Sequence, residues 1–239
     1  MLDVLEVLAP PITIIALILA IWQTGQSITA TRELASIKKS LSTQFLGDFP
    51  SFNDDIADLL SSAKVSILIF CDLPGYGLIS KPNSWHEISS IIEKKSKNTR
   101  INCELTVYDP NRIEQMLTIQ IKKEGGAKSL FSDPEFGKKA QAGLAKVGEV
   151  VTPENYLELS LRKHEEILDY IFTSCDVKRT DKEMPFYFWM IDEREAIISI
   201  PTYSDKVSEY GFRTRDLSFI NALLDIRKKV REDNPPNPG

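Results

Sequence analysis

Metal- and thiol-ligating residues are scarce in this 239-residue chain. It contains two histidines and three cysteines, and no two cysteines form a CxxC pair. A structural zinc site takes four such ligands at characteristic spacings, so we expect no metal, and we find no motif for a cofactor. Cys71, Cys103 and Cys175 are far apart and odd in number, which predicts buried free thiols in a reducing cytoplasm.

No basic run stands out as a nucleic-acid footprint either. The 29 basic and 34 acidic residues are intermixed and give a net charge of −5. A nucleic-acid-binding surface normally shows as a basic patch or stripe, so we do not expect nucleic acid as a partner. The chain has no Walker loop and no serine or cysteine in a nucleophile-elbow context.

One glycine-rich segment follows the first expected strand. Gly75-x-Gly77-x-x-Ser80 resembles part of a dinucleotide-binding turn. Such a turn must lead directly into a helix, so that the phosphate meets the helix N-terminus. Here Lys81-Pro82-Asn83 intervenes, so the glycines are expected to shape a loop.

A long apolar segment stands at the front of the chain. No residue between Glu6 and Arg32 carries a charge, and Val4 to Trp22 is long enough to cross a lipid bilayer. The flanking charge is acidic before the segment and basic after it, which places the N-terminus outside and the following domain in the cytoplasm. We therefore predict a single-pass membrane anchor over residues 1–26, with the bilayer as the partner of Val4 to Trp22.

A helical stripe of apolar residues continues after the anchor. Ala30, Leu34, Ile37 and Leu41 follow 4-3-4 spacing, which predicts a stalk helix over residues 27–45. Two interpretations remain open, because the stalk can lean on its own domain or pair with a second copy in a homodimer.

Residues 46–231 are predicted to form one cytoplasmic α/β domain, followed by a disordered tail at 232–239. Helices are expected over 53–62, 110–123, 134–145 and 153–174, with one more opening at Ser84 and a final one capped by Asp216. Strands are expected over 65–71, 100–108, 185–192, 195–202 and 209–214. Ser84 and Glu87 form a capping-box pattern, and Asp109-Pro110 reads as an N-cap followed by a first-turn proline. Early strand–helix alternation and a late hairpin predict a layered domain with a mixed sheet.

Polar residues that follow strand ends are the candidate binding residues, because ligands of open α/β sheets gather there. The candidates are Asp72, Tyr76, Asp109, Arg112, Tyr203 and Arg213. Asp109 is equally explained as an N-cap, and Asp72 as a residue that closes a turn. We expect His86 to face solvent and His164 to be a core or interface residue.

Two segments resemble parts of a phospholipase D-like domain. They are SSAKVSILIFCD and PFYFWMIDEREAIISIPTYSDKVSEYGFRTRD, and the order of elements agrees over most of Ser51 to Arg231. The family pattern is His-x-Lys-x4-Asp, in which histidine attacks phosphorus and lysine holds phosphate oxygens. Asp192 matches the aspartate, but Pro185 and Tyr187 stand at the histidine and lysine positions, and Ile200-Pro201-Thr202 replaces the Ser-x-Asn segment. The resemblance implies a degenerate member without phosphodiester chemistry.

These observations favour a membrane-anchored, non-catalytic domain that binds a ligand or partner as a sensor or regulator. The alternative is a membrane-tethered phosphodiesterase- or nuclease-like hydrolase, whose general bases would be His86, His164 or the acids at strand ends. A third interpretation gives the domain no ligand and makes it a docking surface for other membrane proteins.

Overall fold

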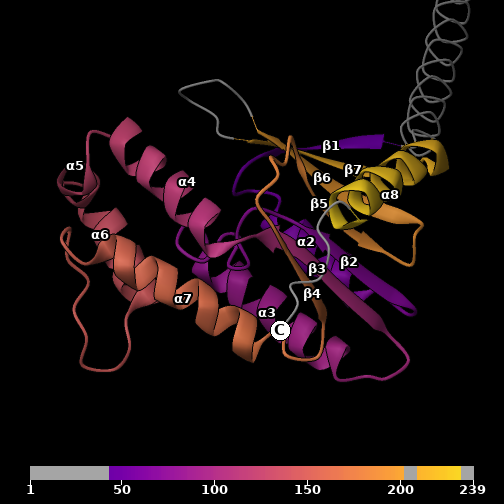
Figure 1. Ribbon diagram of the computed structural model, residues 1–239, viewed down its shortest axis with the longest axis horizontal. Helices are drawn as coiled ribbons and strands as arrows, with labels where there is room; N and C mark the ends of the chain where they lie inside the picture. Colours follow the sequence, from indigo (N-terminus) through magenta and orange to yellow (C-terminus); the bar gives the residue numbers. More distant parts are fainter. Residues whose placement is uncertain (1–42, 202–208, 233–239) are drawn as a thin grey trace, which may run out of the picture. The chain divides into compact units, whose positions relative to one another are not determined.

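A seven-stranded mixed sheet organises residues 43–201 and 209–232, the parts of the chain that the computed structural model describes (Figure 1). The strand order is β1-β7-β6-β5-β2-β3-β4. β2, β3 and β4 are parallel, and all other neighbours are antiparallel. The strands are β1 (Thr43–Asp48), β2 (Ser66–Phe70), β3 (Asn102–Tyr108), β4 (Asp176–Thr180), β5 (Tyr187–Ile191), β6 (Glu195–Pro201) and β7 (Glu209–Thr214). The predicted α/β domain with a mixed sheet is confirmed.

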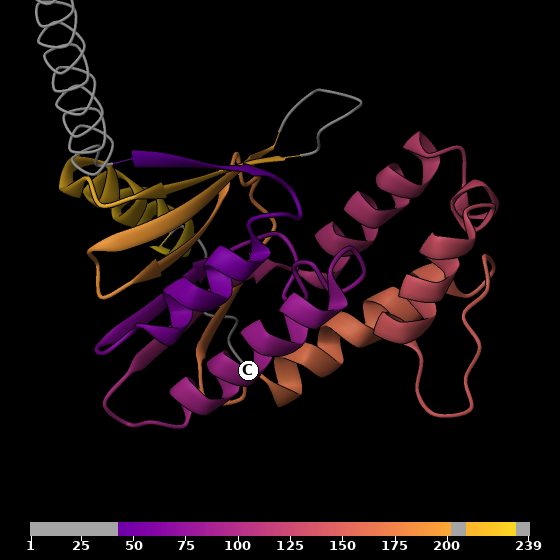
Figure 2. The same cartoon turned by 180° about the vertical axis from the view of Figure 1, so that it is seen from behind.

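Helices cover both faces of the sheet. α2 (Asn53–Ser61) and α3 (Pro82–Ser96) lie on one face, and α8 (Leu217–Glu232) lies on the other (Figures 1 and 2). Four more helices connect β3 to β4 and project from one end of the sheet as a separate layer (Figure 1). They are α4 (Pro110–Lys123), α5 (Ala127–Phe131), α6 (Pro134–Leu144) and α7 (Tyr156–Tyr170). We call residues 109–175 the helical insertion.

The core is centred on β2 and β5. Every residue of both strands is buried, as expected for central strands that have neighbours on both sides and helices on both faces. The rings of Phe70 and Phe188 stack across the two strands, with centroids 5.2 Å apart and planes 9° apart.

Hydrogen bonds connect the turn between β5 and β6 to the start of β2. Asp192 and Glu193 have φ of 51° and 50°, the left-handed conformation that suits a tight hairpin turn. In this position Oδ1 of Asp192 accepts hydrogen bonds from the backbone N–H groups of Lys64, Val65 and Ser66, at 3.1, 2.7 and 2.9 Å. The aspartate that carries the family resemblance therefore fixes the register of two central strands.

Local details differ from the sequence prediction in several places, and β4 and α5 were not predicted. α3 begins at Pro82, and the Ser84 hydroxyl donates to the Asp54 carboxylate at 2.5 Å, so the predicted capping box is wrong. β1 begins at Thr43, within the range assigned to the stalk helix. The Asp109 cap is confirmed, since its carboxylate accepts the Arg112 N–H at 2.8 Å.

The predicted anchor, most of the predicted stalk and residues 233–239 lie outside the described residues. Within residues 43–201 and 209–232, no helix has the length and apolar character needed to span a bilayer.

Replacement of Asp192 tests whether its hydrogen bonds to the backbone before β2 stabilise the fold. Asp192→Ala leaves three backbone amides without this acceptor, so the free energy of unfolding should fall by about 2 kcal/mol in urea denaturation. Glu193→Ala is the matched control, because Glu193 is exposed and shares the left-handed conformation. It should change stability by no more than about 0.5 kcal/mol. Equal losses in the two variants would contradict the assignment.

Candidate ligand-binding site

Polar side chains from four segments meet at one end of the sheet. They are Asp72 after β2, Tyr76 in the next loop, Tyr187 at the start of β5, Ser199 in β6 and Glu209 at the start of β7. β5 and β7 start where β2 and β6 end, because they run antiparallel to them. We call these five residues the acid cluster.

Glu209 is held by two hydroxyl groups. Oη of Tyr76 and Oγ of Ser199 both donate to Oε2 of Glu209, and these two hydroxyl oxygens lie 3.2 Å apart. Burial raises the pKa of Glu209, although both hydrogen bonds oppose the shift. The carboxylate is thus fixed in orientation and holds a proton more readily than an exposed glutamate.

Asp72 is the second acid of the cluster, and it is buried. Burial, and then the nearby charge of Glu209, raise its pKa to about 7, against hydrogen bonds from the Tyr187 hydroxyl and the Leu73 N–H. Burial also raises the pKa of Tyr187, so its hydroxyl stays protonated as a donor. Close to neutral pH the Asp72 carboxyl group can therefore exchange a proton with a ligand at little cost.

The acid cluster borders a cavity of about 460 Å³. One wall is the loop after β2 with the end of the sheet, and the other wall is the helical insertion. Its lining includes Phe49, Asp72, Gly75, Tyr76, Gly77, Leu78, Met116, Leu117, Gln120, Phe136, Lys139, Tyr156, Ser160, His164 and Glu209. Apolar and aromatic walls with a few convergent polar groups are typical of small-molecule sites.

His164 enters this cavity from α7. Its side chain is 5% exposed, and Nδ1 has no hydrogen-bond partner among the described residues. Desolvation lowers the pKa of His164 to about 4, so the imidazole is neutral at physiological pH. A Cβ at Gly75 would lie 3.2 Å from Nδ1 and 2.9 Å from Cδ1 of Ile167, which explains glycine at that position.

Ser160 and Cys71 are not arranged as nucleophiles. Ser160 lies one turn before His164, but its hydroxyl donates to the Tyr156 carbonyl at 2.7 Å. The Cys71 thiol donates to the Leu73 carbonyl at 3.2 Å, and burial raises its pKa. An activated nucleophile needs a base within hydrogen-bond reach, which neither group has here. Among the described residues, no group of three or more His, Cys, Asp or Glu side chains is placed to hold a metal ion.

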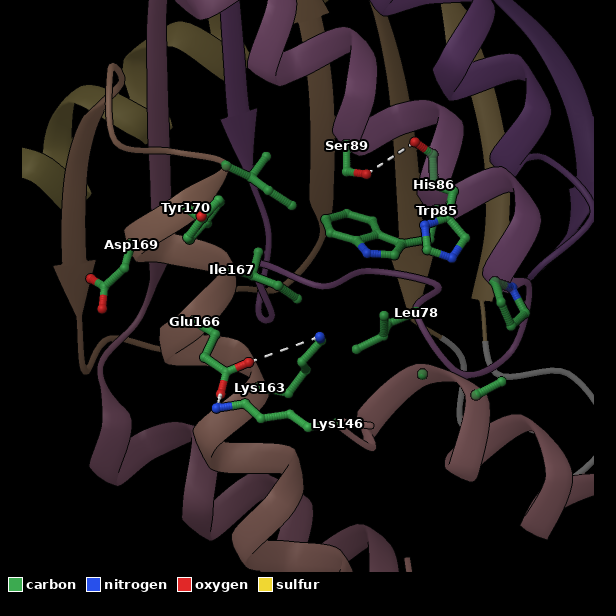
Figure 3. A pocket seen from close by; sticks show the side chains of 14 residues that line it. Leu78, Trp85, His86, Ser89, Lys146, Lys163, Glu166, Ile167, Asp169 and Tyr170 are labelled. Carbon is green, nitrogen blue, oxygen red and sulfur yellow. Dashed lines mark hydrogen bonds and ion pairs between the residues drawn. The ribbon is translucent and has the colours of Figure 1, made fainter. Parts of the chain in front are cut away.

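A second cavity of about 580 Å³ lies between α3, α6 and α7 (Figure 3). Leu78 and Trp85 give it an apolar side, and Lys146 and Lys163 point toward Glu166 across it. Lys146 Nζ lies 2.7 Å and Lys163 Nζ 3.9 Å from the Glu166 carboxylate. These charges satisfy one another, so this cavity is the weaker candidate.

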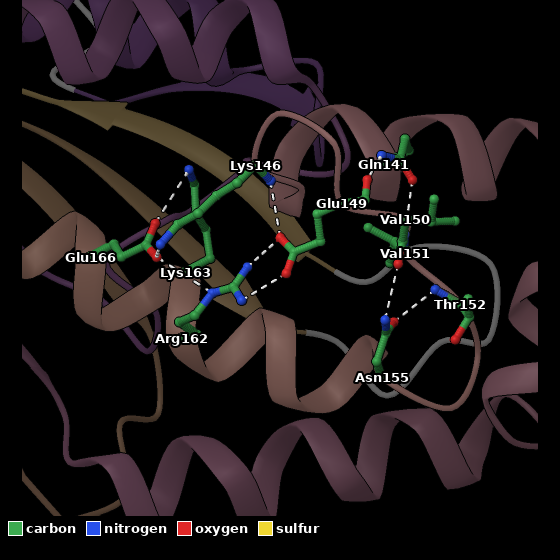
Figure 4. Close-up of polar contacts among 10 residues, drawn as sticks. All are labelled: Gln141, Lys146, Glu149, Val150, Val151, Thr152, Asn155, Arg162, Lys163 and Glu166. Atoms are coloured by element: carbon green, nitrogen blue, oxygen red, sulfur yellow. Dashed lines mark hydrogen bonds and ion pairs between the residues drawn. The ribbon is translucent and has the colours of Figure 1, made fainter.

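Polar contacts hold the connection between α6 and α7 (Figure 4). Arg162 makes two parallel hydrogen bonds to Glu149, at 2.8 and 2.5 Å, and the Lys146 N–H also donates to Glu149 at 3.0 Å. The Arg162 hydrogen bonds, with the Lys146 N–H, lower the pKa of Glu149 to about 2. The Gln141 amide joins the same loop, accepting from the Val151 N–H at 2.9 Å. These contacts position α7, and therefore His164.

Of the predicted site residues, Asp72 and Tyr76 lie together in the first cavity. Asp109 caps α4, and the Arg112 guanidinium lies 5.5 Å from the centre of the Tyr108 ring. Neither residue lines the cavity, and both have a structural explanation.

Arg213 lies toward the opposite end of β7, where Nε is 2.6 Å from the Glu195 carboxylate, and Tyr203 lies outside the described residues. Sequence reasoning missed Glu209 and Tyr187. The available clue was that strands antiparallel to β2 must begin where β2 ends.

Neither a protein-family model nor a curated protein sequence matches this chain. Two solved structures resemble it. One is TrmBL2, described as an archaeal chromatin protein with a novel mode of DNA binding, with 10% identity over 88% of this chain and a TM-score of 0.44. The other is NucT from Helicobacter pylori, with 12% identity, 80% of this chain, 95% of that chain and a TM-score of 0.41. The chain spans 62% of the TrmBL2 chain.

These likenesses correct one sequence prediction. We did not expect nucleic acid as a partner, yet TrmBL2 binds DNA, so that exclusion is contradicted and is withdrawn. The exclusion was based on a net charge of −5 and intermixed signs. Net charge averages over the whole chain and does not describe the local surface that a ligand meets.

The loop that carries Tyr76 depends on Gly77. Gly77 has φ of +83°, and a Cβ there would collide with the Asn53 amide. Gly148 has the same φ of +83° with no atom within 4 Å, so it is the matched control. Gly77→Ala should lose about 1–3 kcal/mol more stability than Gly148→Ala, measured by urea denaturation. Equal losses would show that backbone conformation alone requires the glycine.

The acid cluster should make stability depend on pH. The folded state binds the Asp72 proton more tightly than the unfolded state, because the pKa rises from 3.8 to about 7. The stability from this group is complete below about pH 4 and is lost as the pH rises to about 7. Asp72→Asn cannot ionise, so between about pH 4 and pH 8 it should gain roughly 2–4 kcal/mol relative to wild type.

Denaturant melts at several pH values measure this difference, and the exposed Asp58→Asn is the control. A difference between Asp72→Asn and wild type that does not change with pH would contradict the buried position of the acid.

Proposed function

We propose that this α/β domain is a non-catalytic receptor for a small molecule, and that the ligand occupies the cavity beside the acid cluster. The observation that carries the proposal is the convergence of Asp72, Glu209 and the unpartnered Nδ1 of His164 on one cavity. All three groups can accept hydrogen bonds, since a neutral imidazole leaves one ring nitrogen without hydrogen. The ligand class that fits is a small molecule with several N–H or O–H donors, such as an amine or a polyol.

The hydrogen bonds of Ser160 and Cys71 support binding over catalysis, because both groups donate to backbone carbonyls and not to a base. His164 itself is neutral and buried. We further propose that the fold is phospholipase D-like and has lost the catalytic motif. In support, Asp192 is retained as a structural residue while Tyr187, at the lysine position, belongs to the acid cluster.

We also propose a membrane location, with the receptor domain on the cytoplasmic side. Its support comes from the sequence alone: the uncharged stretch between Glu6 and Arg32 and the basic residues that follow it.

A thermal-shift measurement on the purified full chain tests the receptor function. The panel contains primary amines, polyols, nucleotides, short DNA and phosphodiesters. A ligand at about 100 times its dissociation constant adds about 2.7 kcal/mol, which is a clear rise in melting temperature. We expect a shift with an amine or polyol that is lost in Asp72→Asn and His164→Ala.

His86→Ala is the matched control, because His86 is exposed at the edge of the second cavity. It should keep the full shift. A shift that survives both cavity variants would contradict the site. Turnover of a phosphodiester by wild type that is lost in His164→Ala would replace the receptor with the hydrolase.

A further inference from the structure

Two cysteines lie side by side at the starts of β3 and β4, the two strands that flank the helical insertion. Cys103 is on β3, and Cys175 immediately precedes β4. The parallel register pairs Glu104 with Asp176, which places the two cysteines next to each other. Their sulfur atoms are 2.6 Å apart. Neighbouring strands are about 4.8 Å apart, within the Cα separation of about 4.4–6.8 Å that a disulfide spans.

We propose that Cys103 and Cys175 are a redox modification site, at which a reversible disulfide closes the helical insertion. The sulfur–sulfur contact and the neighbouring strand positions bring the two side chains within reach of a bond. Intracellular disulfides are usually transient and redox-sensing, which suits a pair of free thiols poised in contact. This inference is independent of the proposed ligand.

The two thiols differ in reactivity. Cys175 is partly exposed, and its hydrogen bonds with Cys103 and then Ser96 lower its pKa. Cys103 is 4% exposed, and the bond with Cys175, with burial, raises its pKa. Ser96 and Ser174 line a surface hollow of about 250 Å³ beside the pair, which gives a small oxidant access. Cys175 is therefore the attacking thiolate.

A small-molecule disulfide such as oxidised glutathione supplies the oxidant. The Cys175 thiolate attacks one of its sulfurs, forms a mixed disulfide and releases one glutathione thiolate. Cys103 then gives up its proton and attacks Sγ of Cys175, forming the protein disulfide and releasing the second glutathione thiolate. Two protein thiols are oxidised, one glutathione disulfide is reduced to two thiols, and the reverse reaction restores the pair.

The bond would constrain one wall of the cavity. The cavity residues from Met116 to His164 all lie between the two cysteines, and the closed loop spans 72 residues. Closing a loop of this length stabilises the fold mainly by restricting the unfolded chain. Oxidation should therefore raise the melting temperature by about 4 °C or more and slow amide hydrogen exchange in the last turns of α7.

The experiment is a titration of the full chain in glutathione buffers from reducing to oxidising. Alkylation counts how many of the three thiols are free, intact mass detects the loss of hydrogen atoms, and peptide mapping identifies which cysteines are linked. We expect two thiols to be lost together, a mass decrease of two hydrogen atoms, and a linked Cys103–Cys175 peptide. Three thiols under every buffer, or a bond that joins two chains, would overturn the proposal.

Cysteine variants supply the controls. Cys71 is buried and burial raises the pKa of its thiol, so Cys71→Ser should oxidise as wild type does. Cys103→Ser should stop at a mixed disulfide with glutathione on Cys175, and Cys175→Ser should keep both remaining thiols. Loss of thiols from Cys175→Ser at the wild-type midpoint would contradict the assigned roles.

Discussion

The antiparallel insertion of β5 between β2 and β6 determines the chemistry of this domain. β2 ends where β5 begins, and β6 ends where β7 begins, so Asp72, Tyr187, Ser199 and Glu209 share one end of the sheet. At the other end the hairpin turn is held by Asp192, whose carboxylate binds the amides that lead into β2. A register slip of one residue would reverse every side chain of β5 and dismantle both ends at once.

The helical insertion covers this polar end of the sheet, and the two together enclose a cavity. Its helices bring His164 and a set of apolar side chains over the acid cluster, and the Glu149–Arg162 contact fixes the loop before α7. Both ends of the insertion belong to parallel neighbouring strands, which is why Cys103 and Cys175 meet. The proposed ligand site and the proposed thiol site therefore belong to one structural unit.

The local features of this fold were predictable, and the contacts between distant segments were not. The apolar runs of β2 and β5, the hairpin turn and the Asp109 cap follow from short-range rules. β4, with the sequence DVKRT, has no apolar run and is a strand only because β3 pairs with it. Glu209 reads as an ordinary surface acid until β6 and β7 are paired, and the adjacency of Cys103 and Cys175 requires the parallel pairing across 72 residues.

Asp72 is buried and Glu209 is half-buried, and burial raises the pKa of both acids at this end of the sheet. Carbon-13 NMR of the side-chain carboxyl groups, recorded as the full chain is titrated from acid to alkaline pH, measures this directly. Asp72 should titrate at about 7, and Glu209 should also titrate above its ordinary range. Titration of both groups near 4, as for solvated carboxyls, would contradict it.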